Sequence, residues 1–162
     1  MENLSEKLPK GFVSRLKNTL GADYQNYEEA INQDSVRGIR VNTKRMPVAE
    51  FCEKHKEEIV KIDYADDGFV FKSDEKIGNS SEHLSGIVYL QEPSSMLAVC
   101  SSGIEKEGRP LKVLDLCASP GGKTSQIACR ITEDSLLVSN EIISSRAGVL
   151  FSNVESSTFN VP

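Results

Sequence analysis

Apolar residues in the first part of the chain recur at the spacing of an amphipathic helix. Between residues 9 and 20 they share one helical face, at Phe12, Val13, Leu16 and Leu20, which predicts a helix. Pro9 suits the first turn of this helix, and Gly21 suits its C-terminal end. Two more helices are predicted, over residues 24–31 and 48–56.

Short apolar runs between and after these helices predict strands. The runs cover residues 36–42, 59–62, 69–71 and 87–90, and in the first of them apolar and polar residues alternate only in part. The polar segment 73–84 contains Gly78-Asn79-Ser80-Ser81 and is predicted to be a loop. Short helices and strands mixed in this order predict a small α+β module over residues 1–90.

After residue 90, helices and strands alternate. A helix from Pro93 to about residue 102 is followed by a strand at 111–116, a helix at 123–131, a strand at 135–140 and a helix at 144–155. The last helix has apolar residues at i, i+3, i+4 and i+7, which are Ala147, Leu150, Phe151 and Val154. Alternation of strands and helices is typical of a parallel sheet. We therefore predict an α/β fold, in which residues 91–162 begin a Rossmann-like sheet and strand 111–116 is buried.

The segment after strand 111–116 has the composition of a ligand-binding loop. Its residues are small or turn-forming and lead into the next helix: Cys117, Ala118, Ser119, Pro120, Gly121, Gly122, Lys123 and Thr124. The two adjacent glycines can adopt positive φ angles. Ligands bind at the carboxyl ends of strands in open α/β sheets, beside helix N-termini whose amides attract anionic groups. The loop therefore predicts a nucleotide-like cofactor, and the alternative is a tight turn without a ligand.

Two acidic residues could support such a site. Glu141 follows the apolar strand at 135–140, nineteen residues after Gly122, which is about the distance at which a doubly wound fold holds a ribose hydroxyl. The alternative for Glu141 is a solvated acid in the first turn of the next helix, where the helix dipole favours it. Asp115 lies inside a strand, where an unpaired carboxylate is costly. Asp115 either orients the loop, faces the cofactor or caps loop amides.

The type of cofactor is not fixed by the loop alone. Gly122-Lys123-Thr124 matches the end of a phosphate-binding P-loop, but that motif has a glycine at the position of Cys117. The G-x-G-x-x-G fingerprint is absent, which argues against a dinucleotide. On these residues, a P-loop nucleotide and another nucleoside-containing cofactor both remain open.

Composition narrows the class of protein. The chain has 162 residues, 38% of them hydrophobic, and a net charge of −5, so it is long enough for one domain or two small ones. Its apolar content is too high for a disordered chain. The sequence contains neither an apolar run of about 20 residues nor a signal peptide. These features predict a cytoplasmic protein without a membrane partner.

The acidic total argues against bulk electrostatic binding to nucleic acid. One local basic cluster is nevertheless present, made of Arg37, Arg40, Lys44 and Arg45. The four cysteines form no C-x-x-C pair: Cys52, Cys100, Cys117 and Cys129. Histidine is also scarce, so we expect no zinc or other metal site. We expect all four cysteines to be small buried residues.

Two motifs occurring together are specific to one protein family. The first is Tyr-Leu-Gln-Glu-Pro-Ser-Ser-Met at 89–96, and the second is Val-Leu-Asp-Leu-Cys-Ala-Ser-Pro-Gly-Gly-Lys-Thr at 113–124. Asn140-Glu141, Ser145-Arg146 and Asn153-Val154-Glu155 extend the match, and segment 37–43 is similar to an RNA-contacting module. With these residues the chain resembles the NOL1/NOP2/Sun family of RNA cytosine-C5 methyltransferases, especially its bacterial ribosomal-RNA branch.

The resemblance implies a fold, a cofactor and a partner. Residues 91–162 would be the N-terminal part of a Rossmann-like methyltransferase domain, preceded by the α+β RNA-contacting module of residues 1–90. S-adenosylmethionine would bind the loop 117–123, with Glu141 on its ribose. Arg37, Arg40, Lys44 and Arg45 would contact RNA, with ribosomal RNA as the substrate and transfer RNA as the alternative.

The resemblance also implies what this segment lacks. The family's two catalytic cysteines, one of which attacks C6 of cytosine, lie on later strands. We therefore assign no catalytic residue within residues 1–162, and expect a fragment that is inactive alone and has an unpaired sheet edge prone to association. Ser119 stands where alanine is usual, and residues 156–159 depart from the family's glycine-containing turn. The alternative functions are a non-catalytic RNA-binding module and a P-loop nucleotidase.

Overall fold

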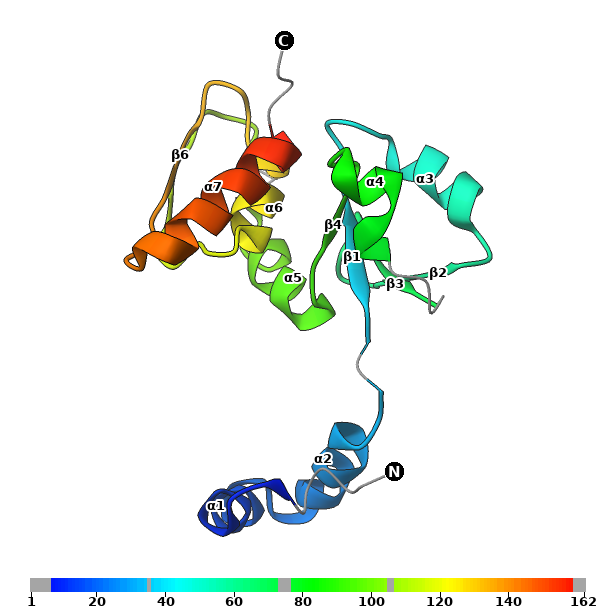
Figure 1. Ribbon diagram of the computed structural model, residues 1–162, viewed down its shortest axis with the longest axis vertical. Helices are drawn as coiled ribbons and strands as arrows, with labels where there is room; N and C mark the ends of the chain where they lie inside the picture. The colour runs from blue at the N-terminus through cyan, green and yellow to red at the C-terminus, as the bar shows by residue number, and fades with distance from the viewer. Residues whose placement is uncertain (1–6, 35, 73–76, 105–106, 159–162) are drawn as a thin grey trace. The chain divides into compact units, whose positions relative to one another are not determined.

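The computed structural model describes residues 7–34, 36–72, 77–104 and 107–158, and contacts divide the chain into units 1–35 and 36–162 (Figure 1). The first unit contains α1 (Lys10–Leu20) and α2 (Tyr24–Ile31), joined by the 3₁₀ turn η2 (Gly21–Asp23). Gly21 has a φ of 55°, the left-handed conformation that ends many helices. Both helices predicted for this segment are confirmed.

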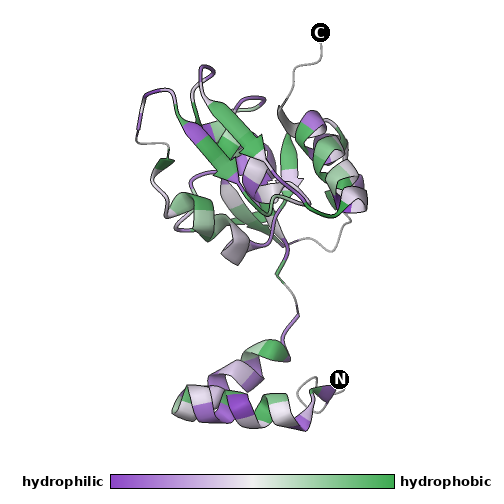
Figure 2. Ribbon diagram, turned by 90° about the vertical axis from the view of Figure 1, so that its left-hand side faces the viewer, coloured by the Kyte–Doolittle hydropathy of each residue, from purple (hydrophilic) through white to green (hydrophobic). Residues whose placement is uncertain are grey.

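The second unit begins with a four-stranded antiparallel sheet in the order β2-β3-β1-β4. Its strands are β1 (Gly38–Val41), β2 (Ile59–Lys61), β3 (Gly68–Phe71) and β4 (Val88–Leu90). In the central strand β1, Ile39 lies opposite Phe69 on one side and Leu90 on the other. Figure 2 shows that the strands are among the most hydrophobic segments of the unit. All four strands predicted before residue 91 are confirmed.

One face of this sheet carries the main hydrophobic core. The core joins strand residues to Phe51 of α3 (Val48–His55) and to Ile77, which follows β3: Ile39, Val41, Phe51, Phe69, Phe71, Ile77 and Val88. The rings of Phe51 and Phe69 lie 5.9 Å apart. Full burial of each large apolar side chain contributes about 1.5–3 kcal/mol, so this face anchors the unit.

The opposite face of the sheet is also covered. Because side chains alternate along a strand, Arg40 and Asn42 point away from the main core. A smaller apolar cluster of Ile62, Ala65 and Met96 lies on this side, with Met96 supplied by α5 (Pro93–Cys100). Every residue of β1 is therefore buried, although only half of its side chains are apolar.

A second, parallel sheet follows. It pairs β5 (Lys112–Asp115) with β6 (Leu136–Ser139), and α6 (Gly122–Arg130) connects them. Helix α7 (Ser144–Thr158) packs against α6. The parallel pair with its helices confirms the predicted α/β class.

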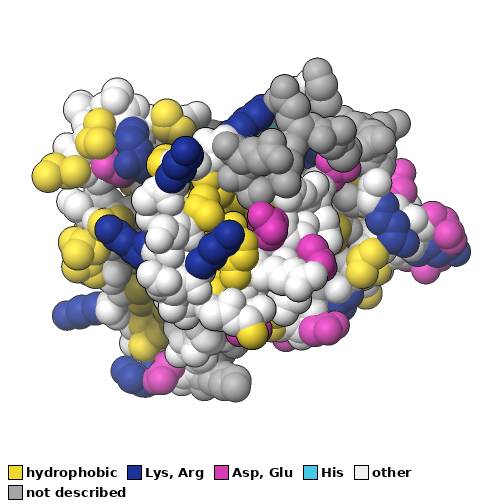
Figure 3. All heavy atoms as spheres, turned by 90° about the horizontal axis from the view of Figure 1, so that it is seen from below, with side chains coloured by type: hydrophobic (Ala, Val, Ile, Leu, Met, Phe, Trp, Pro, Cys, Tyr) yellow, Lys and Arg dark blue, Asp and Glu magenta, His cyan; other side chains and the backbone are white. Residues whose placement is uncertain are grey.

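The prediction that strand 111–116 is buried is wrong. Apolar side chains on one face of the pair are about half exposed or more: Leu114 61%, Leu116 63%, Leu136 55% and Val138 48%. The helices cover only the other face, and no described element covers these four residues, which we name the exposed apolar face. Figure 3 shows hydrophobic side chains reaching the surface in several places. Parallel strands are ordinarily buried on both faces.

The predicted loop at 73–84 contains regular structure where it is described. Residues 73–76 lie outside the described residues, and η3 (Ile77–Asn79) and α4 (Ser81–Leu84) follow. Ile77 buries its side chain in the main core. The Ser80 hydroxyl accepts a hydrogen bond from the backbone amide of His83 at 3.1 Å, which caps α4. The polar composition therefore reflected helix capping as well as turns.

No helix in the described part of the chain is both long and apolar enough to cross a membrane. The predicted boundary between modules at residue 90 remains a prediction.

Candidate functional site

The glycine loop lies between the end of β5 and the start of α6, as predicted. The Gly121 amide donates to the carbonyl of Ala118 at 2.8 Å, and the Ser125 amide donates to the carbonyl of Gly121 at 2.8 Å. Gly121 has a φ of 114°, a conformation that other residues rarely adopt. A Cβ atom at Gly121 would lie 3.4 Å from Leu150 Cδ1. The loop therefore requires glycine here for its backbone and packs closely on α7.

Gly122 is closely packed by side chains from another element. A Cβ atom there would lie 3.2 Å from the ring of Tyr89 and 3.5 Å from the side chain of Gln91. Both neighbours come from the β4–α5 junction. The glycine lets this junction approach the start of α6 closely, so the two motifs identified in the sequence meet in space.

A pocket of about 240 Å³ opens between the loop and the β4–α5 junction. Its lining combines both motifs: Tyr89, Leu90, Gln91, Glu92, Ser95, Cys117, Ala118, Ser119, Pro120, Gly122 and Lys123. The loop residues predicted to bind cofactor all line it except Gly121. The β4–α5 residues were not predicted as site residues, although the motif at 89–96 was the sequence signal for them. The volume lies below the roughly 300–1,000 Å³ of typical ligand pockets.

Asp115 orients the start of α6. The Thr124 hydroxyl donates to Asp115 Oδ2 at 2.7 Å, and the Ser139 hydroxyl donates to Thr124 Oγ1 at 3.3 Å. Thr124 is buried. The Asp115 carboxylate thus holds the first turn of α6, directly after the loop, and its expected roles at the loop amides and the cofactor stay predictions.

Glu141 is held at the end of β6 by the start of α7. Its Oε1 atom accepts a hydrogen bond from the Ile143 amide at 2.9 Å, and its Oε2 atom lies 3.6 Å from Arg146 NH1. Arg146 NH2 in turn donates to the carbonyl of Ser119 at 3.0 Å. Arg146 thus connects Glu141 to the glycine loop. The Glu141 side chain is 4% exposed, so it is not the solvated acid of the alternative hypothesis.

The opposite wall of the pocket carries a negative charge. Glu92 caps α5, accepting hydrogen bonds from the Ser94 hydroxyl and from the Ser95 amide, the latter at 2.9 Å. These bonds, with a contribution from the charge of Lys123, hold the pKa of Glu92 below its ordinary value despite slight burial. The pocket therefore places a carboxylate and an ammonium group near each other at its rim.

The predicted RNA-contacting cluster divides into two groups. Arg37, Lys44 and Arg45 are exposed, and the Arg45 guanidinium donates to the carbonyl of Ser85. Arg40 is 1% exposed, which contradicts its prediction as an RNA contact. Its position on β1 faces α6 rather than solvent, so no phosphate can reach it in this structure.

The four cysteines differ in their exposure to solvent. Cys52, Cys100 and Cys129 are partly buried, whereas Cys117 is exposed in the pocket. The prediction of burial is therefore wrong for Cys117, because the loop turns this side chain toward the space between the two motifs.

A family model matches residues 8–93, just over half of the chain. It describes the N-terminal domain of the 16S rRNA methyltransferase RsmF. The chain belongs to this family. The predicted resemblance to the ribosomal-RNA branch of the NOL1/NOP2/Sun proteins is thereby confirmed.

Curated relatives carry the name ribosomal RNA small subunit methyltransferase F. The Vibrio parahaemolyticus protein is 34% identical over an alignment of 156 residues that covers 91% of this chain and 32% of the relative. A Vibrio cholerae protein is 35% identical, with 91% and 33% covered. The chain thus spans about a third of the length of the curated relatives it matches.

Solved structures share the fold. A methyltransferase homologue from Pyrococcus horikoshii aligns with a TM-score of 0.80 at 23% identity, over 97% of this chain and 52% of that chain. NSun6 from the same organism, solved with SFG, aligns with a TM-score of 0.74 at 14% identity, over 91% and 62%. At these identities the likeness establishes the fold alone.

Proposed function

We propose that this chain is the N-terminal part of an S-adenosylmethionine-dependent enzyme that methylates C5 of cytosine in ribosomal RNA. The observation that carries the proposal is the pocket in which both family motifs meet, at the carboxyl end of β5. Open α/β sheets bind ligands at this end of their strands. The names of the curated relatives support ribosomal RNA as the substrate, and transfer RNA is the alternative.

The residues present fit a nucleoside cofactor. The pocket is lined by loop residues with small side chains, among them Ala118, Ser119 and Gly122, so a ligand can approach the backbone closely. Residues 117–123 would hold the cofactor. Glu141 does not line the pocket itself, and Arg146 connects it to the loop carbonyl of Ser119. In the proposal its carboxylate holds the ribose, and the start of α7 must move to open the 4% exposed side chain to the cofactor. The cofactor, when bound, supplies an activated methyl group.

The chain's other contribution is contact with RNA. Arg37, Lys44 and Arg45 are exposed on the unit that holds the pocket. Lysine and arginine contacts to phosphates position RNA-binding proteins and make their affinity depend on salt. These three residues, without Arg40, are therefore the proposed RNA contacts.

The P-loop alternative receives less support. In a P-loop the hydroxyl after the lysine binds Mg²⁺, but the Thr124 hydroxyl is buried and donates to Asp115 at 2.7 Å. A nucleotidase would have to break this hydrogen bond.

A chimera tests the proposal. Residues 1–158 would replace the matching third of the Vibrio parahaemolyticus relative, and transfer of labelled methyl groups to unmodified 16S rRNA would be measured. We expect activity above that of the relative without its N-terminal third, and loss of activity on Glu141→Ala. RNA binding without methyl transfer would favour the non-catalytic RNA-binding alternative, and ATP hydrolysis would favour the nucleotidase.

A further inference from the structure

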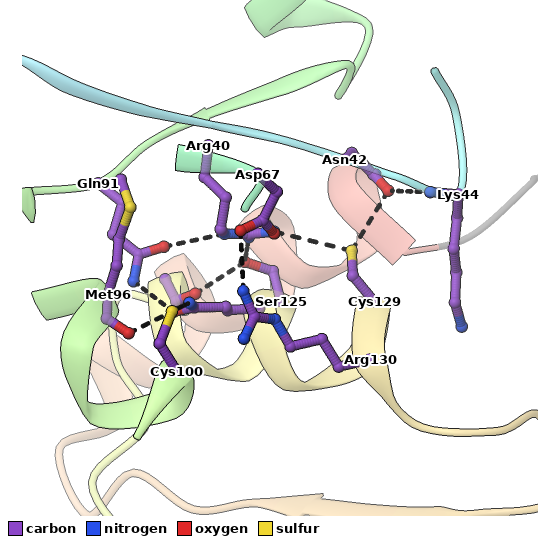
Figure 4. A network of polar contacts seen from close by, with 12 residues as sticks. Arg40, Asn42, Lys44, Asp67, Gln91, Met96, Cys100, Ser125, Cys129 and Arg130 are labelled. Carbon is purple, nitrogen blue, oxygen red and sulfur yellow. Dashed lines mark hydrogen bonds and ion pairs between the residues drawn. The ribbon is translucent and has the colours of Figure 1, made fainter. Parts of the chain in front are cut away.

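A buried arginine joins the antiparallel sheet to the glycine loop. Arg40 lies in the middle of the sheet, and its side chain points toward α6 (Figure 4). Its Nε atom donates to Gln91 Oε1 at 3.0 Å, and NH2 donates to Ser125 Oγ at 2.7 Å. Asp67 Oδ2 lies 4.0 Å from NH1. A guanidinium presents its donors in a fixed planar fork, so these contacts define its orientation.

Two of the hydrogen-bonded partners of Arg40, Ser125 and Gln91, continue to Gly122, whereas the third, Cys129 Sγ, accepts from NH1 at 3.7 Å. The Ser125 hydroxyl, which accepts from Arg40, itself donates to the carbonyl of Gly122 at 3.1 Å. Gln91, which accepts from Arg40 Nε, places its side chain 3.5 Å from the Cβ position of Gly122. Arg40 therefore reaches the same loop residue from two sides, without lining the pocket itself.

Polar contacts also fix the rotation of α6. The helix buries Thr124, Ser125 and Gln126, all 0–1% exposed. Gln126 Oε1 accepts from Gln91 Nε2 at 2.9 Å, and Gln126 Nε2 donates to the carbonyl of Met96 at 3.2 Å. Hydrogen bonds are directional, whereas apolar packing is not. Such an interface sets the rotation of the helix that begins with the glycine loop.

We propose that Arg40 is a positioning residue that holds the glycine loop in its ligand-binding shape. The sheet of the N-terminal module and the cofactor pocket are thereby coupled through one buried side chain. The part of this inference that concerns the cofactor rests on the proposed function, whereas the holding of the loop does not.

The experiment measures amide hydrogen exchange of residues 117–126 in the chain without ligand. Ser125→Ala removes the hydroxyl that connects Arg40 to the carbonyl of Gly122 and leaves Gln91 in place. Arg40→Lys keeps the positive charge but loses the planar set of guanidinium donors. Removing a hydrogen bond to a charged group should raise loop exchange about tenfold in both variants. Val41→Ala is the control, because Val41 neighbours Arg40 but packs in the main core on the opposite face.

The control separates positioning from general loss of stability. Val41→Ala should lower the melting temperature and leave loop exchange unchanged, since loop amides exchange through local opening. Loop exchange in Ser125→Ala and Arg40→Lys that equals the wild type, or that matches Val41→Ala, would overturn the proposal.

Calorimetric titration with S-adenosylhomocysteine tests the coupling to the cofactor. We expect Arg40→Lys to weaken its affinity about tenfold, with Val41→Ala unchanged. Equal affinity of Arg40→Lys and wild type would overturn the coupling. If the wild type binds no S-adenosylhomocysteine, the proposed function fails in this chain, and the exchange measurement still decides whether Arg40 holds the loop.

Discussion

Replacing Asp67 by asparagine should strongly destabilise residues 36–162. The Asp67 carboxylate is the buried anion between two cations: its Oδ1 lies 2.8 Å from Arg130 NH2 and its Oδ2 lies 4.0 Å from Arg40 NH1. The three side chains are 5%, 12% and 1% exposed. At an effective dielectric constant of about 20, unit charges about 4 Å apart attract by about 4 kcal/mol.

The net effect follows from what asparagine leaves behind. Removing one partner of a buried ion pair costs about 3–5 kcal/mol, because the other charge stays desolvated. Asparagine retains an acceptor for Arg130, so we expect the lower end, about 3 kcal/mol. In a protein of this size, about 3 °C of melting temperature is lost per kcal/mol, which gives a decrease of about 9 °C.

Urea unfolding followed by circular dichroism measures this loss. The matched control is Asp66→Asn, because Asp66 is exposed and surface substitutions stay within about 0.5 kcal/mol. The double variant with Asp67→Asn and Arg130→Met should lose less free energy of unfolding than the sum of the losses in the two single variants, because each single change leaves the other charge unpaired. If Asp67→Asn unfolds at the same urea concentration as Asp66→Asn, the account of the buried charges is wrong.

Three further predictions concern pH, the loop and the sheet. Partial burial lowers the pKa of His55, but hydrogen bonds to Glu58 and Glu82 outweigh burial and raise the pKa above its ordinary 6.5. The contribution of His55 to the free energy of unfolding should therefore be complete below pH 6.5 and be lost as pH rises through the raised pKa. His55→Gln should remove this pH dependence, and a wild-type stability that does not change over this range would contradict the prediction. Gly121→Ala should lower the free energy of unfolding by about 1–2 kcal/mol, because the φ of Gly121 is positive. Gly148→Ala, in the exposed part of α7, should instead raise it by about 0.5–1 kcal/mol. Equal melting temperatures of the two variants would contradict this prediction. Leu114→Lys on the exposed apolar face should reduce self-association, measured by sedimentation, without lowering the melting temperature. Val113→Lys, on the helix-covered face, should instead unfold the β5–β6 pair. Unchanged self-association in Leu114→Lys would refute the prediction that this face drives association.

Local patterns predicted the elements and the loop. The glycine loop was predictable because adjacent glycines at the end of an apolar strand express a backbone requirement, and Gly121 shows it with its φ of 114°. Most helix boundaries were also predictable, since they depend on residues such as Pro93, which begins α5. These features are decided by neighbours in the sequence.

The assignment of Arg40 failed because its environment is not local. The alternation of Ile39, Arg40, Val41 and Asn42 suggests a strand with one face in water. The residues that bury Arg40 lie 51 and 85 positions later, at Gln91 and Ser125. Nothing in the strand itself indicates that a polar helix face will cover it.

The exposure of β5 and β6 has the same origin. Their apolar residues correctly predicted strands, but hydrophobicity does not say which face another element covers. In this structure the helices cover the face of Val113, and Leu114 faces away.

Calorimetric titration of this chain with S-adenosylhomocysteine, in parallel with Mg-ATP, tests the central claim that the glycine loop is a methyltransferase cofactor site. We expect S-adenosylhomocysteine to bind, with an affinity weakened by Glu141→Ala, and Mg-ATP not to bind. Binding of Mg-ATP alone, or S-adenosylhomocysteine binding that is indifferent to Glu141, would contradict it.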